Sequence, residues 1–513
     1  MKTNILSLLA IAGLLTFAGC ANDDTTNNNN DQEPGTEGLT GFVEEENATR
    51  TTGEYDGSGL NFFWTAGDRL WVNTGTALAP VLTQDSQNNI ASKLENNPAN
   101  ASAVKRAAKA KFWFAGTFTA SSYPVRYTGK NGAKDKVTIK AAQSQTIPND
   151  ASHIAEDGDF GVATATKPAG GTQYHFALDH KASYITFMPY TTQAWGPNAV
   201  IQKIRVYTSN TSDALAGTFD LADNGTLSNP AATSNSVTLT VPNFSIPSTE
   251  TYATNAATMV VNPGTYNNVS IEYTLHDPVT NVTGTITKTY PSVTFAAGRN
   301  KKVKTDLQVT VFSPNSYYMW DAQQPYWYGH LDSDGKPDNK NNYPKANTDS
   351  RYFREDASWP YPAANHSAKD CPNVNECLWY IMQGDPHWDN DELWSTIGHL
   401  YKGGMWFKKK TNISGFTDSD YNGTDYRIMD VFPDNTSITQ GKPSNLNEYF
   451  YLPASGRYLF GTLLNASTNG FYWLSTPRTG AAAHDALDLD FYSGGAFVGR
   501  IGRNCGYPLW TAQ

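Results

Sequence analysis

Charged side chains and cysteines are both scarce in this 513-residue chain. Asp, Glu, Lys and Arg together make up 17% of the residues, and four residues are cysteine. Low charge beside many Thr, Asn, Ser, Gly and Tyr residues favours an exported, mainly β protein over a cytosolic helical one. The formal net charge of −10 argues against a general nucleic-acid binder.

Long apolar stretches are also lacking, apart from one run at the N-terminus. Residues 5–17 are apolar, follow the positive charge of Lys2 and are too few to span a membrane. This arrangement predicts a signal peptide over residues 1–19.

The residues that end the signal peptide resemble a bacterial lipobox. Ala18-Gly19-Cys20 implies cleavage before Cys20 and attachment of lipid to its thiol. Asn22-Asp23-Asp24 resembles the acidic signal that sends Bacteroidetes lipoproteins to the cell surface. The expected location is therefore that of an outer-membrane lipoprotein precursor at the cell surface. Residues 21–37, rich in Asn, Asp, Thr, Pro and Gly, are expected to form a flexible tether.

Short strand-like segments fill the chain from residue 60 to residue 312. The second half of residues 174–187 alternates apolar and polar side chains, as a half-buried strand does. The spacing of the segments and the Asn, Pro and Gly residues between them are typical of β-sandwiches, and no parallel β-α-β alternation is present. The further candidates are residues 62–64, 70–72, 112–114, 137–139, 200–207, 236–241, 258–261, 269–275 and 303–312.

Three motifs in this region resemble the fimbrillin-like family of Bacteroidetes, the subunits of type V pili. They are Trp64-Thr65-Ala66-Gly67-Asp68-Arg69-Leu70, Phe176-x-x-x-His180-x-Ala182 and Phe295-Ala296-Ala297-Gly298, the last followed by a closing strand. The resemblance covers about residues 40–312 and implies two transthyretin-like β-sandwich domains, at residues 51–180 and 181–312. Trp64, Phe176 and His180 are then expected to pack in the cores.

The same resemblance suggests that Arg50 is a processing site. In the family, a trypsin-like protease cuts lipidated precursors after an arginine, which releases an N-terminal strand and opens a groove. A strand from the next subunit fills that groove, so the expected partners are other pilus subunits. Arg50 ends the tether and removable segment (residues 20–50), and cleavage there predicts a mature protein that begins at Thr51. The alternative is that Arg50 is a solvated surface residue.

Tryptophan is concentrated after residue 312. Nine of the 13 Trp residues lie in residues 313–513, which predicts a separate C-terminal domain with its own aromatic packing. Cys371 and Cys377 are close enough in sequence for a local disulfide in an exported protein. Residues 376–382 are a short helix candidate, because Leu378 and Met382 lie one turn apart.

Four motifs near the C-terminus resemble a C-type-lectin-like domain of bacterial surface proteins, including the adhesins diversified by retroelements. They are Leu452-Pro453-Ala454-x-Gly456-Arg457, Gly470-x-Tyr472-Trp473-x-Ser475-Thr476-Pro477, Ala486-Leu487-x-Leu489-x-Phe491 and Arg500-x-Gly502-Arg503. The match covers about residues 371–513. It implies an α+β domain whose core contains Trp473 and the Leu487-x-Leu489-x-Phe491 strand.

The display surface implied by this resemblance begins at Tyr492. Tyr and Trp offer large contact areas at low rotamer cost, and Asn adapts its hydrogen bonds to the ligand. The alternative places Phe497 and Trp510 in the core. The expected ligand is a host, microbial or glycan surface. The predicted ligand-binding residues are Tyr492, Phe497, Arg500, Asn504, Tyr507 and Trp510.

Motifs for metal binding are weak. The sugar-binding calcium motifs of C-type lectins are not intact. Trp388-Asp389-Asn390-Asp391 is only weakly similar to one of them and lies too early in the domain. Asp332-x-Asp334-Gly335-x-x-Asp338 has oxygen ligands at short spacing but lacks the terminal Glu of a calcium loop. We predict a solvated acidic turn and no cofactor, with Ca²⁺ binding at this turn as the alternative.

Catalytic motifs are missing. The sequence contains no Gly-x-Ser-x-Gly elbow, no His-Glu-x-x-His and no zinc-ligand spacing. Cys505 stands alone as a weak nucleophile candidate, and Asp488 and Asp490 are expected to be solvated residues on one face of a strand. The chain is therefore predicted not to be an enzyme.

Taken together, these patterns predict a pilus adhesin. An N-terminal cut would make an acceptor groove, while the binding domain would occupy the place from which a stalk subunit offers its donor strand. The subunit is therefore expected at the pilus tip. The alternative is a surface glycan-binding lipoprotein of a polysaccharide-uptake system, which would keep residues 20–50.

Overall fold

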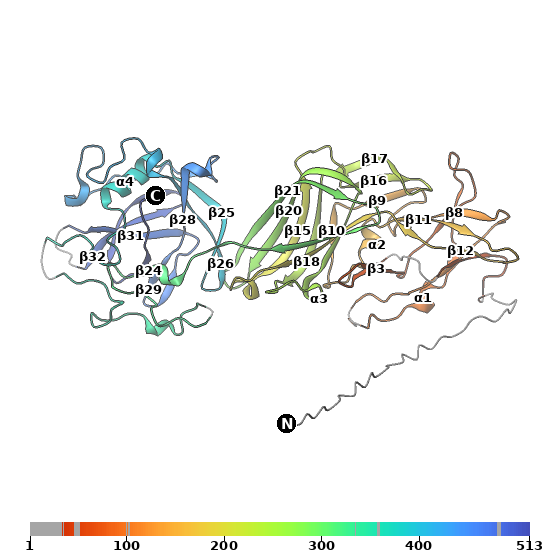
Figure 1. Cartoon of the computed structure of the whole chain (residues 1–513), viewed down its shortest axis with the longest axis horizontal. Helices are drawn as coiled ribbons and strands as arrows, with labels where there is room; N and C mark the ends of the chain where they lie inside the picture. The colour runs from red at the N-terminus through yellow and green to blue at the C-terminus, as the bar shows by residue number, and fades with distance from the viewer. Residues whose placement is uncertain are drawn as a thin grey trace, which may run out of the picture.

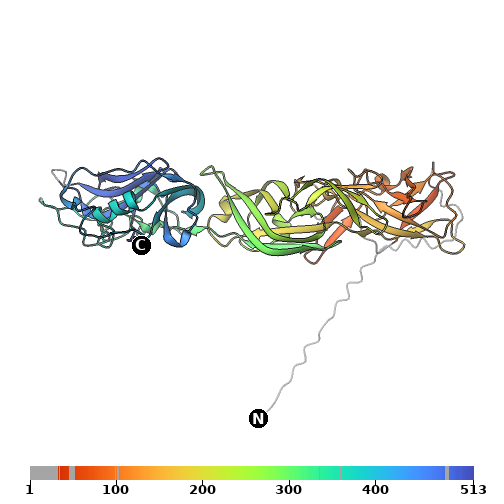
Figure 2. The ribbon, with the colours of Figure 1, turned by 90° about the horizontal axis from the view of Figure 1, so that it is seen from above.

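The computed structural model describes residues 33, 35–45, 52–98, 100, 103–333, 335–356, 360–479 and 484–513. The predicted signal peptide, Cys20 and Arg50 lie outside these residues. The chain is mainly β, as the sequence predicts, with 45% strand and 9% helix. Figures 1 and 2 show three bodies in a row, with the N-terminal strands at one end and the C-terminal strands at the other. No helix in the described part of the chain has the length and apolar character needed to cross a membrane.

The N-terminal body is built on a nine-stranded sheet in the order β5-β4-β8-β11-β12-β1-β7-β6, with β13 paired to β11. Alternate side chains of these strands point inward and form one aromatic cluster, in which Trp64 and Phe176 are buried as predicted. The strands are β1 (Thr40–Glu44), β4 (Trp71–Asn73), β5 (Leu82–Gln84), β6 (Gln87–Asn88), β7 (Lys111–Phe114), β8 (Ser122–Tyr127), β11 (Gly161–Thr166), β12 (Tyr174–Phe176) and β13 (Asp179–His180).

The middle body has a five-stranded sheet in the order β10-β18-β15-β20-β21 and a three-stranded sheet in the order β19-β14-β22. Apolar residues from both sheets share one large cluster. The strands are β10 (Ala142–Ser144), β14 (Ser183–Tyr190), β15 (Val200–Thr208), β18 (Ser236–Ser245), β19 (Ala257–Val261), β20 (Gly264–Asp277), β21 (Val282–Phe295) and β22 (Asn300–Asp306).

Smaller elements join the N-terminal and middle bodies. A hairpin of β2 (Thr52–Tyr55) and β3 (Leu60–Phe63) carries Phe62, which stacks on the buried ring of His180 at 4.0 Å. A further sheet has the order β17-β16-β9 and is formed by β9 (Lys136–Ile139), β16 (Ala216–Leu221) and β17 (Leu227–Ser234). β10 pairs with β18 of the middle body, whereas β8 and β11, which come before and after it in the sequence, belong to the N-terminal sheet, so the chain passes between the two bodies more than once. A domain boundary at residue 180 stays a prediction.

The C-terminal body contains a five-stranded sheet in the order β23-β25-β26-β28, with β27 paired to β25, and a three-stranded sheet in the order β31-β32-β33. Two small pairs, β24-β34 and β29-β30, complete it. The strands are β23 (Thr310–Val311), β24 (Tyr317–Tyr318), β25 (His387–Thr396), β26 (His399–Lys408), β27 (Thr439–Gln440), β28 (Tyr449–Pro453), β29 (Arg457–Leu459), β30 (Thr462–Leu464), β31 (Asn469–Pro477), β32 (Asp485–Tyr492), β33 (Gly495–Gly502) and β34 (Tyr507–Pro508).

Helices are few and short. The longest, α4 (Val374–Gln383), confirms the helix predicted near residue 376. It begins at a capping box, in which Asn373 accepts backbone N–H groups of the first turn and Glu376 accepts the N–H of Asn373. The others are α1 (Ile90–Lys93), α2 (Ile154–Asp157), α3 (Tyr252–Asn255), η1 (Gly196–Asn198), η2 (Pro314–Ser316), η3 (Lys340–Asn342), η4 (Lys410–Asn412), η5 (Tyr426–Ile428) and η6 (Leu446–Glu448).

The middle and C-terminal bodies meet at the hairpin of β25 and β26. Asp277 is fully buried, lies 3.0 Å from His399 Nδ1 and accepts the Leu400 N–H at 3.0 Å. Leu393 and Leu400 enter the hydrophobic cluster of the middle body, and β23 pairs in parallel with β25. The C-terminal body is therefore packed against the middle body and is not connected to it by a linker alone.

Candidate functional site

The β32–β33 hairpin carries the first part of the tract that is predicted to bind ligand. Alternation along β33 sends Ala496 and Val498 into the core beside α4 and turns Phe497 to the other face, where it is half-buried. Tyr492 lies next to Phe497, with ring centroids 6.4 Å apart, and 42% of Tyr492 is exposed. These two aromatic residues thus share one face of the sheet.

Arg500 belongs to a different surface. Its Nε lies 3.5 Å from Asp430 Oδ1, and its guanidinium carbon lies 5.4 Å from the ring centre of Phe432. Arg478 Nε approaches the same Asp430 oxygen at 3.7 Å. The loop that follows η5 is therefore held against the end of β33. The end of η5 and this loop expose three apolar side chains, with exposed fractions of 75% for Ile428, 41% for Met429 and 81% for Val431.

We call this surface the Arg500 patch, and it consists of Ile428, Met429, Val431, Phe432, Arg478 and Arg500. Exposed apolar side chains gathered in one place, beside arginine and an aromatic ring, are typical of surfaces that bind another molecule. This loop was not among the predicted binding residues, although its signal is visible in the sequence: Ile428-Met429-x-Val431 is an apolar run within a polar, irregular segment.

Tyr507 and Trp510 are not surface residues, which corrects the prediction that they contact ligand. Tyr507 is 1% exposed and stacks on Trp473 with ring centroids 4.3 Å apart. Burial raises the pKa of its hydroxyl far above the ordinary value. Trp510 is 6% exposed, and its Nε1 donates to the Trp473 carbonyl at 3.1 Å. The last residues of the chain therefore pack against Trp473, which is itself in the core as expected.

Arg503, which follows Gly502, serves mainly to hold the fold. Arg503 is fully buried, and its Nη1 donates to Asp356 Oδ2 at 2.7 Å. Its guanidinium carbon lies 4.2 Å from the ring centre of Trp320. Asn504 is half-buried. Of the six predicted ligand-binding residues, Tyr492 and Arg500 are the two that are clearly exposed.

Asp488 and Asp490 are not solvated strand residues. Asp488 is 2% exposed, and burial, together with the charge of Asp490, raises its pKa well above the ordinary value. Burial also raises the pKa of Asp490 to about 6, against the hydrogen bond of Asn469 and the charge of Arg457. Among the residues that the structure describes, none is a hydrogen-bond partner of the Oδ1 atom of either carboxyl or of Arg457 Nε. The face of β32 opposite α4 thus carries a buried carboxyl, Asp488, beside a half-buried one, Asp490.

The predicted disulfide between Cys371 and Cys377 is not formed, and Cys505 is free as well. Cys371 packs with Trp320 and Trp473, whereas Cys377 lies on α4 and faces the cluster around Leu378. The two thiols therefore enter different cores. Burial raises the pKa of Cys371 to about 12 and that of Cys505 to about 11, so neither is a thiolate nucleophile at neutral pH.

β1 is a central strand, although few described residues precede it. It pairs in parallel with β12 and antiparallel with β7, so both of its edges are hydrogen-bonded. Phe42 is fully buried, stacks on Tyr174 at 4.7 Å and meets Phe114 edge-on at 4.9 Å. Glu44 accepts a hydrogen bond from the indole N–H of Trp64. Arg50 follows the last residue of β1 by six positions.

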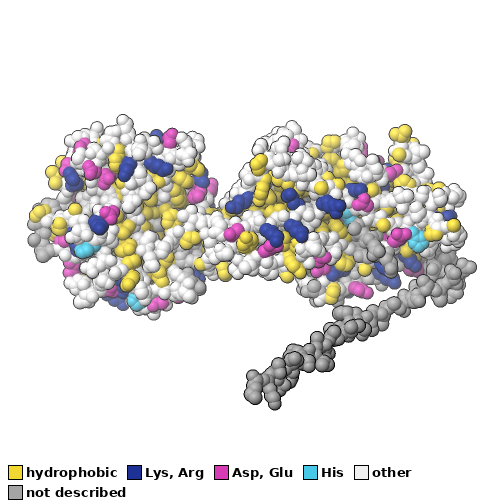
Figure 3. All heavy atoms as spheres, viewed as in Figure 1, with side chains coloured by type: hydrophobic (Ala, Val, Ile, Leu, Met, Phe, Trp, Pro, Cys, Tyr) yellow, Lys and Arg dark blue, Asp and Glu magenta, His cyan; other side chains and the backbone are white. Residues whose placement is uncertain are grey.

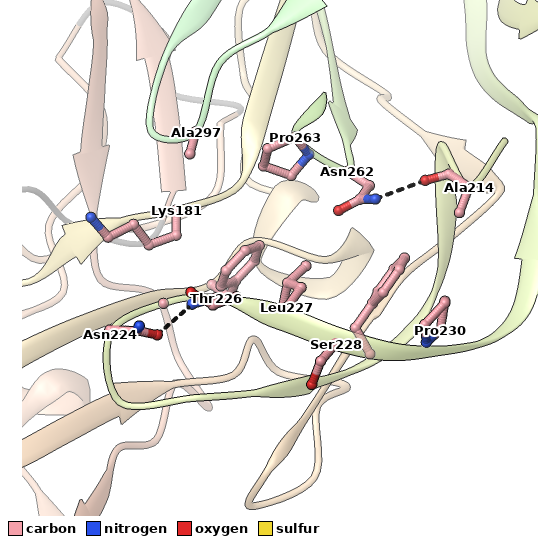
Figure 4. Close-up of a pocket in the computed structure, with 13 residues that line it drawn as sticks. Lys181, Ala214, Asn224, Thr226, Leu227, Ser228, Pro230, Asn262, Pro263 and Ala297 are labelled. Carbon is pink, nitrogen blue, oxygen red and sulfur yellow. Dashed lines mark hydrogen bonds between the residues drawn. The ribbon is translucent and has the colours of Figure 1, made fainter. Parts of the chain in front are cut away.

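A cavity of about 520 Å³ lies beside β17 (Figure 4). Asn224 accepts the Thr226 N–H at 3.0 Å, and Asn262 donates to the Ala214 carbonyl at 2.9 Å. Lys181 pairs with the carboxylate of Asp179. These polar groups already have protein partners and stabilise the cavity walls, so we assign no site there.

The motif that begins at Trp388 lines a cleft of about 810 Å³ between β21 and β25. Asp389 accepts the backbone N–H groups of Asp391 and Glu392 and the indole N–H of Trp406 at 3.0, 3.2 and 3.2 Å, respectively. In the described part of the chain, no group of three or more His, Cys, Asp or Glu side chains is placed to hold a metal ion. Asp334 of the acidic turn lies outside that part.

No protein-family model matches the chain, and no curated protein matches it. Several solved structures are similar to it. A candidate cell adhesion protein from Bacteroides ovatus is 13% identical with a TM-score of 0.29, over 52% of this chain and 92% of that one. A fimbrial assembly protein from Parabacteroides distasonis is 10% identical with a TM-score of 0.27, over 53% and 91%. A fimbrial protein from Bacteroides ovatus is 10% identical with a TM-score of 0.23, over 91% and 97%.

Proposed function

We propose that the protein is a pilus adhesin of the bacterial surface, assembled by strand exchange and binding its ligand through the C-terminal body. The position of β1 carries this proposal. β1 is hydrogen-bonded on both edges, and in the sequence the segment that contains Arg50 connects it to β2 and the strands that follow. A cut after Arg50 would free this strand without breaking the chain that follows.

Loss of β1 would leave a slot that suits an incoming strand. β7 and β12 would each expose a row of unpaired backbone N–H and C=O groups. The site of the Phe42 ring would open between Phe114, Phe118 and Tyr174. An extended segment of another pilus subunit, with an aromatic side chain in the matching position, would restore both the hydrogen bonds and the packing.

β23 supports a place at the pilus tip. It follows the last strand of the middle body and pairs with β25, and the Phe312 N–H donates to the Ser395 carbonyl at 2.8 Å. This segment is therefore committed to the C-terminal body and is not free to enter another subunit. We propose that the subunit accepts a strand but donates none.

We assign ligand contact to the Arg500 patch and to Tyr492. Within the same proposal, the N-terminal and middle bodies are transthyretin-like sandwiches and the C-terminal body is a C-type-lectin-like domain, as the motifs imply. A double substitution, Ile428→Asp with Val431→Asp, should reduce adhesion of cells to the surface that wild-type cells bind, while the level of pilus polymer stays unchanged. Unchanged adhesion would remove the patch from the proposal.

Arg50→Ala tests the assembly step. Wild-type chain should enter high-mass polymers that dissociate on heating, whereas the Arg50→Ala chain should remain a monomeric lipoprotein. Arg205→Ala, which removes an exposed arginine of the middle body, is the control and should polymerise normally. If Arg50→Ala polymerises as wild type does, strand exchange after this cut is wrong. If the wild-type chain keeps its acylated N-terminus and enters no polymer, the glycan-binding lipoprotein becomes the favoured function.

A further inference from the structure

On one side of the middle sandwich, glutamine side chains form hydrogen bonds with the backbone along the outer edge of β19. Gln143 accepts the Val260 N–H at 3.0 Å and donates to the Val260 carbonyl at 2.7 Å. Gln145 accepts the Thr258 N–H at 2.7 Å and donates to the Ala256 carbonyl at 2.9 Å. The two amides bond the outer edge of β19 as a neighbouring strand would, so this edge is already occupied.

On the opposite side, the structure describes no strand or side chain that pairs with the backbone edges of the two sheets in this way. β21 and β22 are the last strands of the two sheets, and among the residues that the structure describes no strand pairs with the outer edge of either. Between them lies a groove of about 160 Å³, enough for a large apolar side chain. Core residues of both sheets line it: Ile185, Val269, Ile271, Val293 and Phe295.

The rim of this groove is basic. Figure 3 shows Lys and Arg side chains gathered over the middle body on the face in view. Lys304 pairs with Glu250, and Lys302 donates to the Gly57 carbonyl, but Lys301 makes no ion pair within the described residues. The exposed cations on and next to β22 are Arg299, Lys301, Lys302 and Lys304.

The two edges differ in what they accept. β21 contains Pro291, which lacks an N–H and disfavours strand addition there. β22 has neither Pro nor Gly, so its backbone can pair along its length. Lysines on an edge strand repel the same strand of a second copy, but they attract a strand that carries carboxylates.

We propose that the open edge of β22 is a docking site for an extended, acidic segment of a partner protein. The segment would add to β22 as a new strand, place an apolar side chain in the groove and pair its flanking carboxylates with the lysines. This site lies in a different body from the β1 slot and needs no cut after Arg50, so it stands or falls independently of the proposed assembly step.

A labelled synthetic peptide, Glu-Glu-Thr-Val-Thr-Ile-Thr-Glu-Glu, is the probe. Its binding to the full-length protein is measured by fluorescence anisotropy, and a matched peptide has Lys in place of every Glu. The acidic peptide should bind at least tenfold more tightly than the basic one, and added salt should weaken it. Hydrogen exchange should slow over residues 300–306 when the acidic peptide is added.

Charge-reversed variants complete the test. Lys301→Glu with Lys302→Glu should weaken the acidic peptide at least tenfold, whereas Lys105→Glu with Lys134→Glu, an equal charge change at exposed lysines of other segments, should not. The proposal is overturned if the acidic peptide fails to bind at millimolar concentration or binds no better than the basic one. Equal binding by both double variants, or protection of a strand other than β22, overturns it as well.

Discussion

At the scale of single residues, burial decides which aromatic side chains of the C-terminal tract can meet a ligand. Tyr492 is exposed, whereas Tyr507 and Trp510 are enclosed by the rings around Trp473. An aromatic residue at the end of a strand or in a short irregular segment can pack inward or outward, and its neighbours in sequence do not decide between the two. Trp64 was easier to predict, because it lies inside a motif with strand candidates on both sides.

Phe42 tests how much the packing of β1 contributes to stability. In an Arg50→Ala background, which keeps β1 attached, Phe42→Ala should lower the free energy of unfolding by about 3–5 kcal/mol, because a fully buried ring is lost from an aromatic cluster. Urea denaturation measures this change. Val43→Ala, at a half-buried position of the same strand, should cost clearly less. Equal losses would contradict the packing described for Phe42.

Asp490 should make stability depend on pH. Its pKa is raised from 3.8 to about 6 by burial, so the folded protein holds a proton there that the unfolded chain releases. Protonation of Asp490 therefore stabilises the folded state relative to the unfolded chain. This contribution to the free energy of unfolding is fully present below about pH 4 and is lost as the pH rises to about 6. Relative to Asp490→Asn, wild type should lose roughly 1.4 kcal/mol of unfolding free energy per pH unit in that window. Parallel urea midpoints of the two proteins between pH 4 and 6 would contradict this.

At the scale of elements, the strand pattern was predictable, but its pairing was not. Alternation marks strand candidates such as residues 137–139 and 200–207, and both regions form strands, β9 and β15. Nothing local indicates that β9 pairs with β16, about 80 residues later, because pairing depends on contacts far apart in the chain. The hairpin of β25 and β26, which docks the C-terminal body, was missed for the same reason.

Asp277 tests that docking. Its carboxylate binds His399 and the Leu400 N–H from across the junction of the two bodies. Asp277→Ala leaves these groups buried without a partner, which costs on the order of 1–3 kcal/mol and should loosen the junction. Small-angle X-ray scattering should then report a wider range of molecular dimensions. The control is Asp213→Ala. It removes a carboxylate that accepts an exposed hydrogen bond from the Asn210 side chain, so the scattering should stay unchanged. An unchanged profile for Asp277→Ala would show that the apolar contacts alone hold the two bodies together.

At the scale of the whole molecule, the two proposed functions lie in different bodies of an elongated chain. The β1 slot belongs to the body at one end, and the Arg500 patch belongs to the body at the other (Figure 1). This separation suits a subunit that joins a polymer at one end and displays its ligand surface at the other. The mainly β character was predictable from composition, whereas the packed junction between the bodies was not.

The N-terminus of the chain in purified surface polymers tests the central claim most directly. Mass spectrometry of the polymer-bound protein should find Thr51 as its first residue, with β1 absent and the remaining chain intact. An acylated Cys20 as the first residue of the polymer-bound protein would contradict the account, since β1 would then still occupy its place between β7 and β12.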